Sequence, residues 1–225
     1  MKESKVLVLV SGGLDSATCL YWAKKNFSQI YAITFDYYGR IENEKKAAIA
    51  LSEKASTLEL FRISIPFIKE SSDFYSGKHV SPTTDKRWAS YIPARNLIFY
   101  SIAAHYAEFL DIKWVIGGHS KDDGLFFKDA TESFIKDMNS LFNRGCQYCN
   151  ERPYTILAPL ASLDRVEIIR LAIKLEVPLD LTWSCHRGGE TQCGQCYACT
   201  SRSEAFRFLG IADPAFSSGD DNKPP

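Results

Sequence analysis

A short polar loop, Ser11-Gly12-Gly13-Leu14-Asp15-Ser16, lies between an apolar run at residues 6–10 and a helix-like stretch at residues 17–25. Two adjacent glycines let backbone N–H groups approach a phosphate closely, and the start of a helix adds its dipole. Ser11 and Ser16 add hydroxyl donors. Asp15 would repel a phosphate unless a cation lies between them, which points to Mg²⁺. The pattern therefore predicts an anion site between a buried parallel strand and a helix.

The same residues also permit a plainer interpretation, a Gly-Gly turn with a serine cap. The loop lacks the Gly-Lys-Ser/Thr ending of a Walker A sequence, which excludes that class of phosphate loop. The order Ser-Gly-Gly-x-Asp-Ser after a strand instead resembles the loop of the ATP pyrophosphatases, the PP-loop superfamily. Those enzymes split ATP between its α and β phosphates and adenylate a substrate, so the resemblance implies ATP as a co-substrate.

Strand-like and helix-like segments alternate along the chain. Further strands are expected at residues 30–35, 60–65, 113–116 and 154–157, and helices at residues 42–58, 94–110, 131–143 and 164–176. This alternation is typical of an α/β fold with a doubly wound, five-stranded parallel sheet. Ligands bind such sheets beyond the carboxyl ends of the strands, so the loops carrying Ser11, Asp36 and residues 117–123 should meet.

Length and composition exclude several classes of protein. A chain of 225 residues with a hydrophobic fraction of 45% suits one α/β domain with a modest appendage. Lys+Arg and Asp+Glu both total 27, so no global charge predicts binding to nucleic acid or a membrane. No apolar run reaches transmembrane length and the N-terminus has no signal-peptide pattern, so a cytoplasmic location is expected.

Four of the seven cysteines form the spacing C-x7-C-x2-C-x2-C near the C-terminus: Cys185, Cys193, Cys196 and Cys199. Four thiolates so close together can surround one tetrahedral Zn²⁺ at about 2.3 Å each, with no open position for catalysis. An iron–sulfur cluster and unliganded thiols are the alternatives. Cys146 and Cys149 form a separate C-x2-C, which fits a half-site, a redox pair or two reduced thiols. Cys19 is expected to be a buried packing thiol.

These patterns predict three parts. Residues 1–180 are expected to form the PP-loop domain, and residues 181–213, here called the cysteine segment, to form the zinc-binding segment and a helix. Residues 214–225 are rich in Ser, Asp and Pro and predict a disordered tail. The polar stretch 69–90 predicts a long loop of the kind that often covers a site.

The loop and the cysteine cluster together resemble the 7-cyano-7-deazaguanine synthase (QueC) family over about residues 5–210. The shared segments, in order, are Phe35-Asp36-Tyr37, Tyr91-Ile92-Pro93-Ala94-Arg95-Asn96, Ala158-Pro159-Leu160 and Leu181-Thr182-Trp183-Ser184-Cys185. The resemblance implies an ATP-dependent ligase that converts 7-carboxy-7-deazaguanine and ammonia to 7-cyano-7-deazaguanine in queuosine and archaeosine biosynthesis. Adenylation gives the carboxylate a leaving group, ammonia then gives an amide, and a second activation with proton loss gives the nitrile.

The resemblance also implies roles for individual residues. The expected ATP site comprises Ser11, Gly12, Gly13, Leu14, Asp15, Ser16, Phe35, Asp36, Arg95, Asn96 and Gly118. Asp15 and Arg95 are the expected catalytic residues, Asp15 through Mg²⁺ and Arg95 as a fork donor that neutralises phosphate charge. Without the resemblance, Arg95 would also fit a surface cation at a helix start. A homodimer is expected.

One segment departs from the family. Where the family has Ser-Gly-Tyr-Pro-Asp-Cys-Arg, this chain has Leu125-Phe126-Phe127-Lys128-Asp129-Ala130-Thr131, so the proline, cysteine and arginine are missing. The expected substrate residues are Asp123, Phe126, Phe127 and Asp129, since carboxylates pair with a guanine-like edge and phenyl rings stack on a heterocycle. The alternative for both aspartates is a solvated loop acid. Lys121 and Lys128 are candidate replacements for the arginine.

This departure keeps three functions open. The first is the nitrile synthase, or a QueC-like variant that joins the activated deazaguanine carboxylate to another amine, including a protein amine. The second is a PP-loop sulfur transferase that modifies tRNA, suggested by Cys146 and Cys149 but disfavoured by the neutral net charge. The third is a zinc-stapled nucleotide-binding scaffold without catalysis.

Overall fold

The computed structural model describes residues 4–68, 92–147 and 153–216. Within them, five parallel strands form one sheet in the order β3-β2-β1-β4-β5. The strands are β1 (Lys5–Leu9), β2 (Gln29–Asp36), β3 (Glu59–Ser64), β4 (Trp114–Ile116) and β5 (Thr155–Leu157). The order reverses between β1 and β4, which confirms the doubly wound α/β sheet and places its switch point there.

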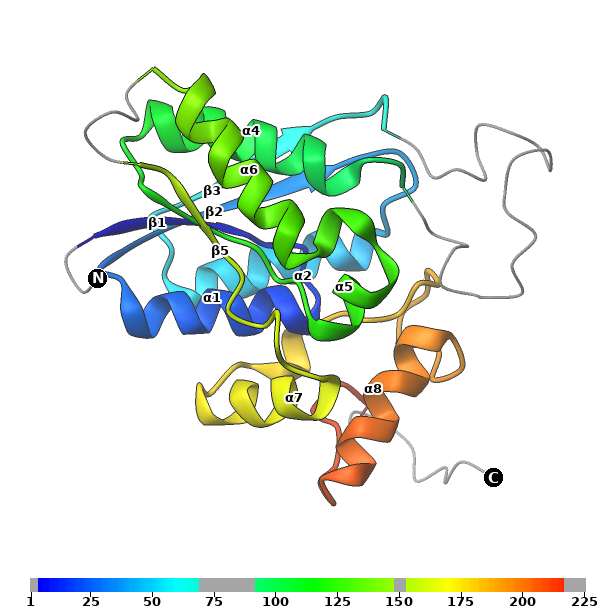
Figure 1. Ribbon diagram of the computed structural model, residues 1–225. Coiled ribbons are helices and arrows are strands. Elements are labelled where there is room, and N and C mark those ends of the chain that lie inside the picture. Colours follow the sequence, from blue (N-terminus) through cyan, green and yellow to red (C-terminus); the bar gives the residue numbers. More distant parts are fainter. Residues whose placement is uncertain (1–3, 69–91, 148–152, 217–225) are drawn as a thin grey trace.

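Helices cover both faces of the sheet (Figure 1). On one face lie α1 (Leu14–Asn26) and α2 (Glu42–Ala55), with α7 (Arg165–Lys174) packed on α1 and α8 (Tyr197–Phe208) packed on α7. On the other face lie α4 (Arg95–Phe109) and α6 (Glu132–Gly145). A short helix, α5 (Lys121–Phe126), follows β4.

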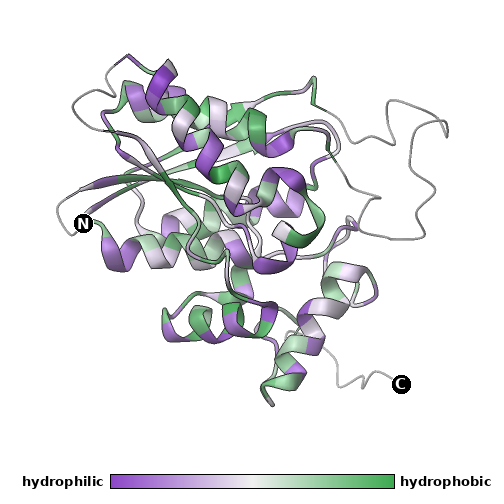
Figure 2. Ribbon diagram, viewed as in Figure 1, coloured by the Kyte–Doolittle hydropathy of each residue, from purple (hydrophilic) through white to green (hydrophobic). Residues whose placement is uncertain are grey.

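Each face of the sheet carries its own hydrophobic core. On β2, Ile30 and Ala32 belong to the core shared with α1 and α2, whereas Ile33 and Phe35 belong to the core shared with α4 and α6. This alternation follows from the two-residue period of a strand. A parallel sheet is buried on both faces, and the central strand β1 is accordingly apolar from Val6 to Leu9, with both faces of the sheet covered by helices (Figure 2).

The helix expected at residues 42–58 ends earlier, at Ala55. Ser56 adopts a left-handed conformation with φ 60°, which stops the helix. The N–H of Leu58 then donates to the carbonyl oxygen of Ile30 over 2.8 Å, so pairing with β2 replaces the last helical turn. Leu58, the last residue of the expected helix, therefore lies outside it, and its side chain is 60% exposed.

Two capping boxes shape the segments around the switch point. Asp164 and Glu167 cap α7, with N–H to carboxylate distances of 2.8 and 2.9 Å. Ser120 and Asp123 cap α5 in the same way. Residues 117–123 were expected to be a loop, and from Lys121 onward this expectation is wrong because the Ser120–Asp123 box satisfies the first N–H groups of a helix.

Two other predictions concern segments that lie partly or wholly outside the described residues. The start of the expected tail, Pro214–Phe216, is a 3₁₀ helix, while residues 217–225 lie outside the described part of the chain. The long loop expected at residues 69–90 also lies outside it. None of the helices that the structure describes has the length and apolar character needed to cross a membrane.

Candidate functional site

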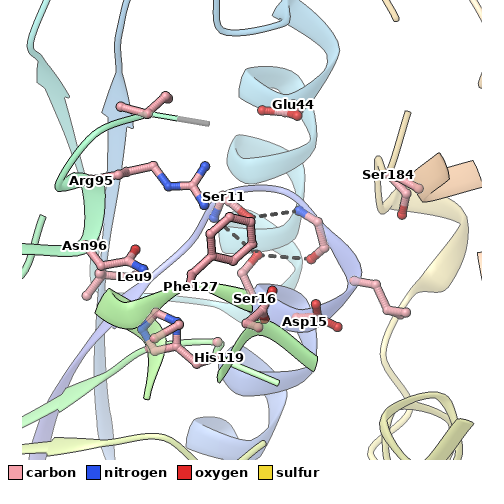
Figure 3. Close-up of a pocket in the computed structure, with 18 of the residues that line it drawn as sticks. Leu9, Ser11, Asp15, Ser16, Glu44, Arg95, Asn96, His119, Phe127 and Ser184 are labelled. Carbon is pink, nitrogen blue, oxygen red and sulfur yellow. Dashed lines mark hydrogen bonds between the residues drawn. The ribbon is translucent and has the colours of Figure 1, made fainter. Parts of the chain in front are cut away.

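A cavity of about 420 Å³ opens at the carboxyl ends of β1, β2 and β4, where the sheet order reverses. It is bounded by residues 11–16, by the start of α4, by residues 119–130 and by the cysteine segment. The expected site residues that line it are Ser11, Gly13, Leu14, Asp15, Ser16, Phe35, Arg95, Asn96, Gly118, Asp123, Phe126, Phe127 and Asp129. Figure 3 shows several of them converging from separate elements. Two expected residues, Gly12 and Asp36, do not line it.

The loop of residues 11–16 is held by its own hydroxyl groups. Ser11 Oγ lies 3.0 Å from Ser16 Oγ, and Ser16 Oγ donates to the carbonyl oxygen of Gly13 over 3.0 Å. Helix α1 begins directly at Leu14, with Gly13 as its N-cap. The first N–H groups of a helix have no partner within it, so this end of α1 offers donors and a positive dipole at the cavity.

Gly12 lies on the side of the loop that packs against α2. Its φ of 98° favours glycine, and a Cβ there would overlap the backbone carbonyl oxygen of Glu44 on α2. The Gly12 carbonyl oxygen accepts a hydrogen bond of 2.9 Å from the N–H of Trp183. Asp36 is paired elsewhere, with Lys45 Nζ at 2.8 Å. Both residues therefore contact their neighbours in the fold rather than the cavity.

Arg40, which the sequence analysis did not select, joins the loop to the second strand. Its side chain is almost fully buried and lines the cavity. Nη1 donates to the carbonyl oxygen of Phe35 over 2.5 Å and Nη2 to that of Ser11 over 2.8 Å. Its guanidinium thereby fixes the end of β2 against the 11–16 loop.

Asp15 forms an ion pair with Arg165, the first residue of α7, over 2.5 Å. Burial raises the pKa of Asp15, and the positive charge of Arg165 partly offsets that rise. Arg165 was also missed from the sequence. The sequence did offer one signal for Arg165, because it follows the fifth strand and the helix-capping residue Asp164. Residues that follow a strand in a parallel sheet lie at its carboxyl edge, where ligands bind.

Asp129 and Asn96 fix the start of α4. The backbone N–H of Asn96 donates to Asp129 Oδ2 over 3.1 Å, and Asn96 Nδ2 donates to the carbonyl oxygen of Asp129 over 3.0 Å. These bonds connect an expected ATP residue with an expected substrate residue. Arg95 precedes Asn96, and its guanidinium points toward Ser11 (Figure 3).

Aromatic rings supply the apolar lining of the cavity. Phe35 and Phe99 stack with centroids 4.1 Å apart and an interplanar angle of 12°. Phe126 and Phe127, from α5 and its C-cap, line the cavity as well, and Phe126 is 37% exposed. The cavity thus combines anion-binding groups with surfaces that suit a planar heterocycle.

The four clustered cysteines fit one metal ion. Their Sγ atoms lie within 4.8 Å of one another, and those of Cys193 and Cys199 are 4.0 Å apart. Four ligands at about 2.3 Å in a tetrahedron lie about 3.8 Å apart, so the arrangement suits Zn²⁺. Burial raises the pKa of the Cys193 thiol, but N–H groups of Gln195 and Cys196 and nearby thiols outweigh it and lower that pKa to about 6. Thiolate character of this kind favours metal binding.

The cysteine segment is also a wall of the cavity, through Ser184, His186, Ser201 and Arg202. Arg202, on α8, is 1% exposed and donates to both carboxylate oxygens of Asp213 over 2.7 and 2.9 Å. It also donates to Thr182 Oγ1 over 2.6 Å and to Ser184 Oγ over 3.2 Å. The cysteine segment and the 11–16 loop therefore form one site, although they lie about 170 residues apart in the sequence.

The three cysteines outside the cluster lie in different parts of the chain. Cys19 is fully buried, as expected, and its thiol lies 3.7 Å from the carbonyl oxygen of Gly117. Cys146 is half-buried at the end of α6, while Cys149 lies outside the described residues. The role of the Cys146–Cys149 pair therefore stays a prediction.

A parallel sheet of order 3-2-1-4-5 with a Ser-Gly-Gly-Leu-Asp-Ser loop at its switch point defines a PP-loop nucleotide-binding fold. Two solved structures share the fold, each with a TM-score of 0.51. NMN synthetase from Francisella tularensis is 19% identical, and the alignment covers 94% of this chain and 79% of that one. A predicted tRNA methyltransferase subunit from Methanocaldococcus jannaschii is 14% identical, with coverages of 97% and 94%.

The family of queuosine biosynthesis protein QueC matches residues 5–210, so the chain belongs to the QueC family. Its relatives include 7-cyano-7-deazaguanine synthases. That of Thermoplasma volcanium is 35% identical over 93% of this chain and 89% of the relative. Those of Nostoc sp. and Persephonella marina are 35% and 33% identical, covering 93% and 96% of this chain and 96% and 97% of the relatives. The resemblance seen in the sequence is confirmed.

Proposed function

We propose that the protein uses ATP to activate the carboxylate of 7-carboxy-7-deazaguanine and couples it to ammonia, giving 7-cyano-7-deazaguanine. The names of its relatives, 7-cyano-7-deazaguanine synthases, support the product of this reaction. The observation that carries it is the composition of one cavity, which has anion-binding groups at residues 11–16 and aromatic and carboxylate groups at residues 123–129. Such a cavity can hold a nucleoside triphosphate against a heterocyclic acid.

The chemistry requires these two ends to be close. A carboxylate is a poor electrophile, and transfer to AMP supplies a leaving group. The N-terminus of α1 offers N–H donors for the phosphates, and the hydroxyls of Ser11 and Ser16 would join them by exchanging their bonds within the loop. Arg95 and Arg165 both line the cavity and would offset charge that develops on the transferred phosphoryl group.

The carboxylate of Asp15 is the group in this loop that would hold Mg²⁺, which supplies further charge neutralisation on the phosphates. Asp15 is an oxygen ligand beside the phosphate donors, so it fits that role. Because the same carboxylate is paired with Arg165, binding of the cation requires Asp15 to share or release that partner. Asp15→Ala should therefore remove Mg²⁺-dependent turnover.

The deazaguanine is assigned to the other end of the cavity. The carboxylates of Asp123 and Asp129 can accept the amino and ring N–H groups of a guanine-like edge, and Phe127 offers a ring face. Neither Lys121 nor Lys128 lines the cavity, so these lysines are poor replacements for the missing arginine. Arg95 and Arg165 are better placed to meet the substrate carboxylate.

Product analysis tests the reaction. The wild-type protein is incubated with 7-carboxy-7-deazaguanine, Mg²⁺-ATP and ¹⁵N-labelled ammonia, and mass spectrometry should detect the labelled nitrile together with AMP and pyrophosphate. Asp15→Ala should abolish the product, while Asp137→Ala, an exposed carboxylate on α6, should not change it. Release of only ADP and phosphate, or no nitrile from the wild type, would contradict the proposal.

Calorimetry tests the base-binding end. Asp129→Asn should weaken binding of 7-carboxy-7-deazaguanine by about ten- to a hundredfold, because a charge-assisted hydrogen bond contributes about 1.5–3 kcal/mol. The asparagine keeps an oxygen that can accept the N–H of Asn96, so the start of α4 should stay in place. Equal affinity of the variant and the wild type would remove Asp129 from the substrate site.

Three further expectations stay predictions. A QueC-like variant that uses another amine, such as a protein amine, would give the same adenylate, and a product of higher mass once that amine replaces ammonia in the assay above. A homodimer would be detected by sedimentation. A sulfur transferase would require Cys146 and Cys149 for activity, so the variant Cys146→Ser should leave nitrile formation unchanged if the proposal holds.

A further inference from the structure

A buried tyrosine and a cavity-lining histidine form a pair that the sequence analysis did not select. Tyr100, on α4, is fully buried, and its hydroxyl lies 2.6 Å from Nε2 of His119. The pair depends on Gly117, where a Cβ would overlap the Tyr100 hydroxyl. The ring of His119 lines the cavity near Ser16 and Phe127 (Figure 3).

The hydrogen-bond chemistry assigns the proton positions. Burial, and then the nearby Cys19 and Asp129, raise the pKa of Tyr100, so the phenol keeps its proton. Burial, assisted by Arg95, lowers the pKa of His119 although Asp123 and Asp129 oppose this, so the ring is neutral at pH 7. A buried hydroxyl without an acceptor costs about 1–3 kcal/mol, so Tyr100 donates to Nε2. The ring proton is then on Nδ1.

We propose that His119 is a catalytic residue whose neutral Nδ1–H stabilises the negative charge that forms on the acyl oxygen when ammonia attacks the adenylate. Tyr100 is a positioning residue that holds His119 in this tautomer. The inference rests on the proposed function above, because it assigns a role within that reaction. A neutral imidazole donor of this kind can stabilise an oxyanion without titrating.

The position of His119 fits this role. Gly118 packs on the loop so closely that a Cβ there would lie 3.2 Å from the backbone of Asp15 and Ser16. The next residue, His119, therefore lies close to the 11–16 loop, and it lines the same cavity as the aromatic residue Phe127 (Figure 3). The carboxyl group that is adenylated must lie between the deazaguanine and the phosphate groups of ATP. Within residues 4–68, 92–147 and 153–216, Nδ1 of His119 forms no hydrogen bond, so it is available to the ligand.

The nitrogen lone pair forms the C–N bond, and the π electrons of the carbonyl group move to its oxygen, which accepts the hydrogen bond from Nδ1–H. When the electron pair on this oxygen re-forms the carbonyl double bond, the bond between the carbonyl carbon and the AMP oxygen breaks. AMP leaves with the electrons of that bond. The attacking nitrogen releases one proton to water. His119 keeps its proton throughout.

Matched variants separate this role from a structural one. An asparagine places an amide nitrogen close to the Nδ1 position, so His119→Asn should keep amide formation within about tenfold of the wild type. His119→Ala should slow amide formation by about 10²–10³-fold, the usual effect of removing one oxyanion donor. Isotope exchange between pyrophosphate and ATP, which reports adenylate formation, should change less than about threefold in both variants. Equal loss of exchange and amide formation in His119→Ala would overturn the proposal.

The tautomer is tested without a substrate. Long-range ¹H–¹⁵N spectra of protein labelled at histidine should show the Nδ1–H form for His119, assigned by its disappearance in His119→Asn. In Tyr100→Phe the Nε2–H form should appear and amide formation should slow. An Nε2–H form in the wild type would overturn the proposal. If the wild type instead forms no adenylate from 7-carboxy-7-deazaguanine, the proposed function fails, and the spectra still decide the tautomer.

Discussion

Oδ1 of Asp15 lies 2.5 Å from Nη1 of Arg165, so an ion pair joins the first turns of α1 and α7 across 150 positions of sequence. An acidic side chain suits the N-terminus of a helix, whereas a basic one there opposes the helix dipole. Arg165 is therefore held at the start of α7 by its partner rather than by its own helix. The pair fixes the 11–16 loop against α7 before any ligand binds.

Removing Arg165 should destabilise the fold. Arg165→Ala leaves the half-buried Asp15 carboxylate without its cation, which should lower the free energy of unfolding by about 2 kcal/mol. Urea unfolding in excess zinc measures this change. Arg165→Lys should recover part of the loss, and Arg170→Ala, on an exposed position of α7, should have no effect. A stable Arg165→Ala protein would mean that the pair contributes nothing measurable.

The raised pKa of Asp15 has a consequence for pH dependence. In the folded state Asp15 holds its proton more tightly than the unfolded value of 3.8 implies. Its contribution to stability is therefore full below pH 3.8 and is lost as the pH rises through the folded-state pKa. The variant Asp15→Asn does not titrate at this position. Relative to it, the free energy of unfolding of the wild type should fall by about 1.4 kcal/mol for each unit by which the folded-state pKa of Asp15 exceeds the unfolded-state pKa. Unfolding of both proteins between pH 4 and 7 tests this, and parallel stability curves would contradict it.

The cysteine cluster should bind one zinc ion per chain. Elemental analysis should find zinc in the wild type and little in Cys196→Ser, since three thiolates hold the ion less tightly. Loss of the ion should also destabilise the cysteine segment, which limited proteolysis can detect. Cys146→Ser, outside the cluster, should keep its zinc. A brown protein that contains iron would overturn this assignment in favour of an iron–sulfur cluster.

Gly117→Ala should be destabilising because its Cβ would overlap the hydroxyl of Tyr100. Overpacking of this kind costs about 1–3 kcal/mol. Tyr100→Phe removes the hydroxyl, so the double variant should be more stable than the sum of the two single effects predicts. Thermal unfolding of the four proteins gives this coupling. Simple additivity would show that Tyr100 does not approach Gly117.

Arg202 should be a major contributor to the stability of the C-terminal part. Arg202→Met removes the partner of the buried Asp213 carboxylate and of two hydroxyls, which should cost about 3–5 kcal/mol. For a chain of this length that is a decrease in melting temperature of roughly 6–20 °C. Arg207→Ala, exposed on the same helix, is the matched control and should not change the melting temperature.

The sequence by itself determined the fold class and the main chemical groups of the site. Apolar runs marked all five strands. The 11–16 loop and the four cysteines were recognised from the order and spacing of their residues. These features are local, because the period of a strand or helix and the ligand spacing of a metal knuckle depend on neighbouring residues. The local pattern failed where backbone pairing or a cap competed with it, at Leu58 and at residues 121–126.

Only the tertiary structure decided how those groups are paired. Strand order brings Asp15 to Arg165 and Tyr100 to His119, and the packing of the cysteine segment brings Trp183 to Gly12. The packing of α2 places Glu44 against Gly12 and Lys45 against Asp36, so these two residues face α2 rather than the cavity. Each partner lies on a different element, so no local period encodes the contact. It exists because the switch point of a parallel sheet gathers the ends of distant strands and helices at one edge.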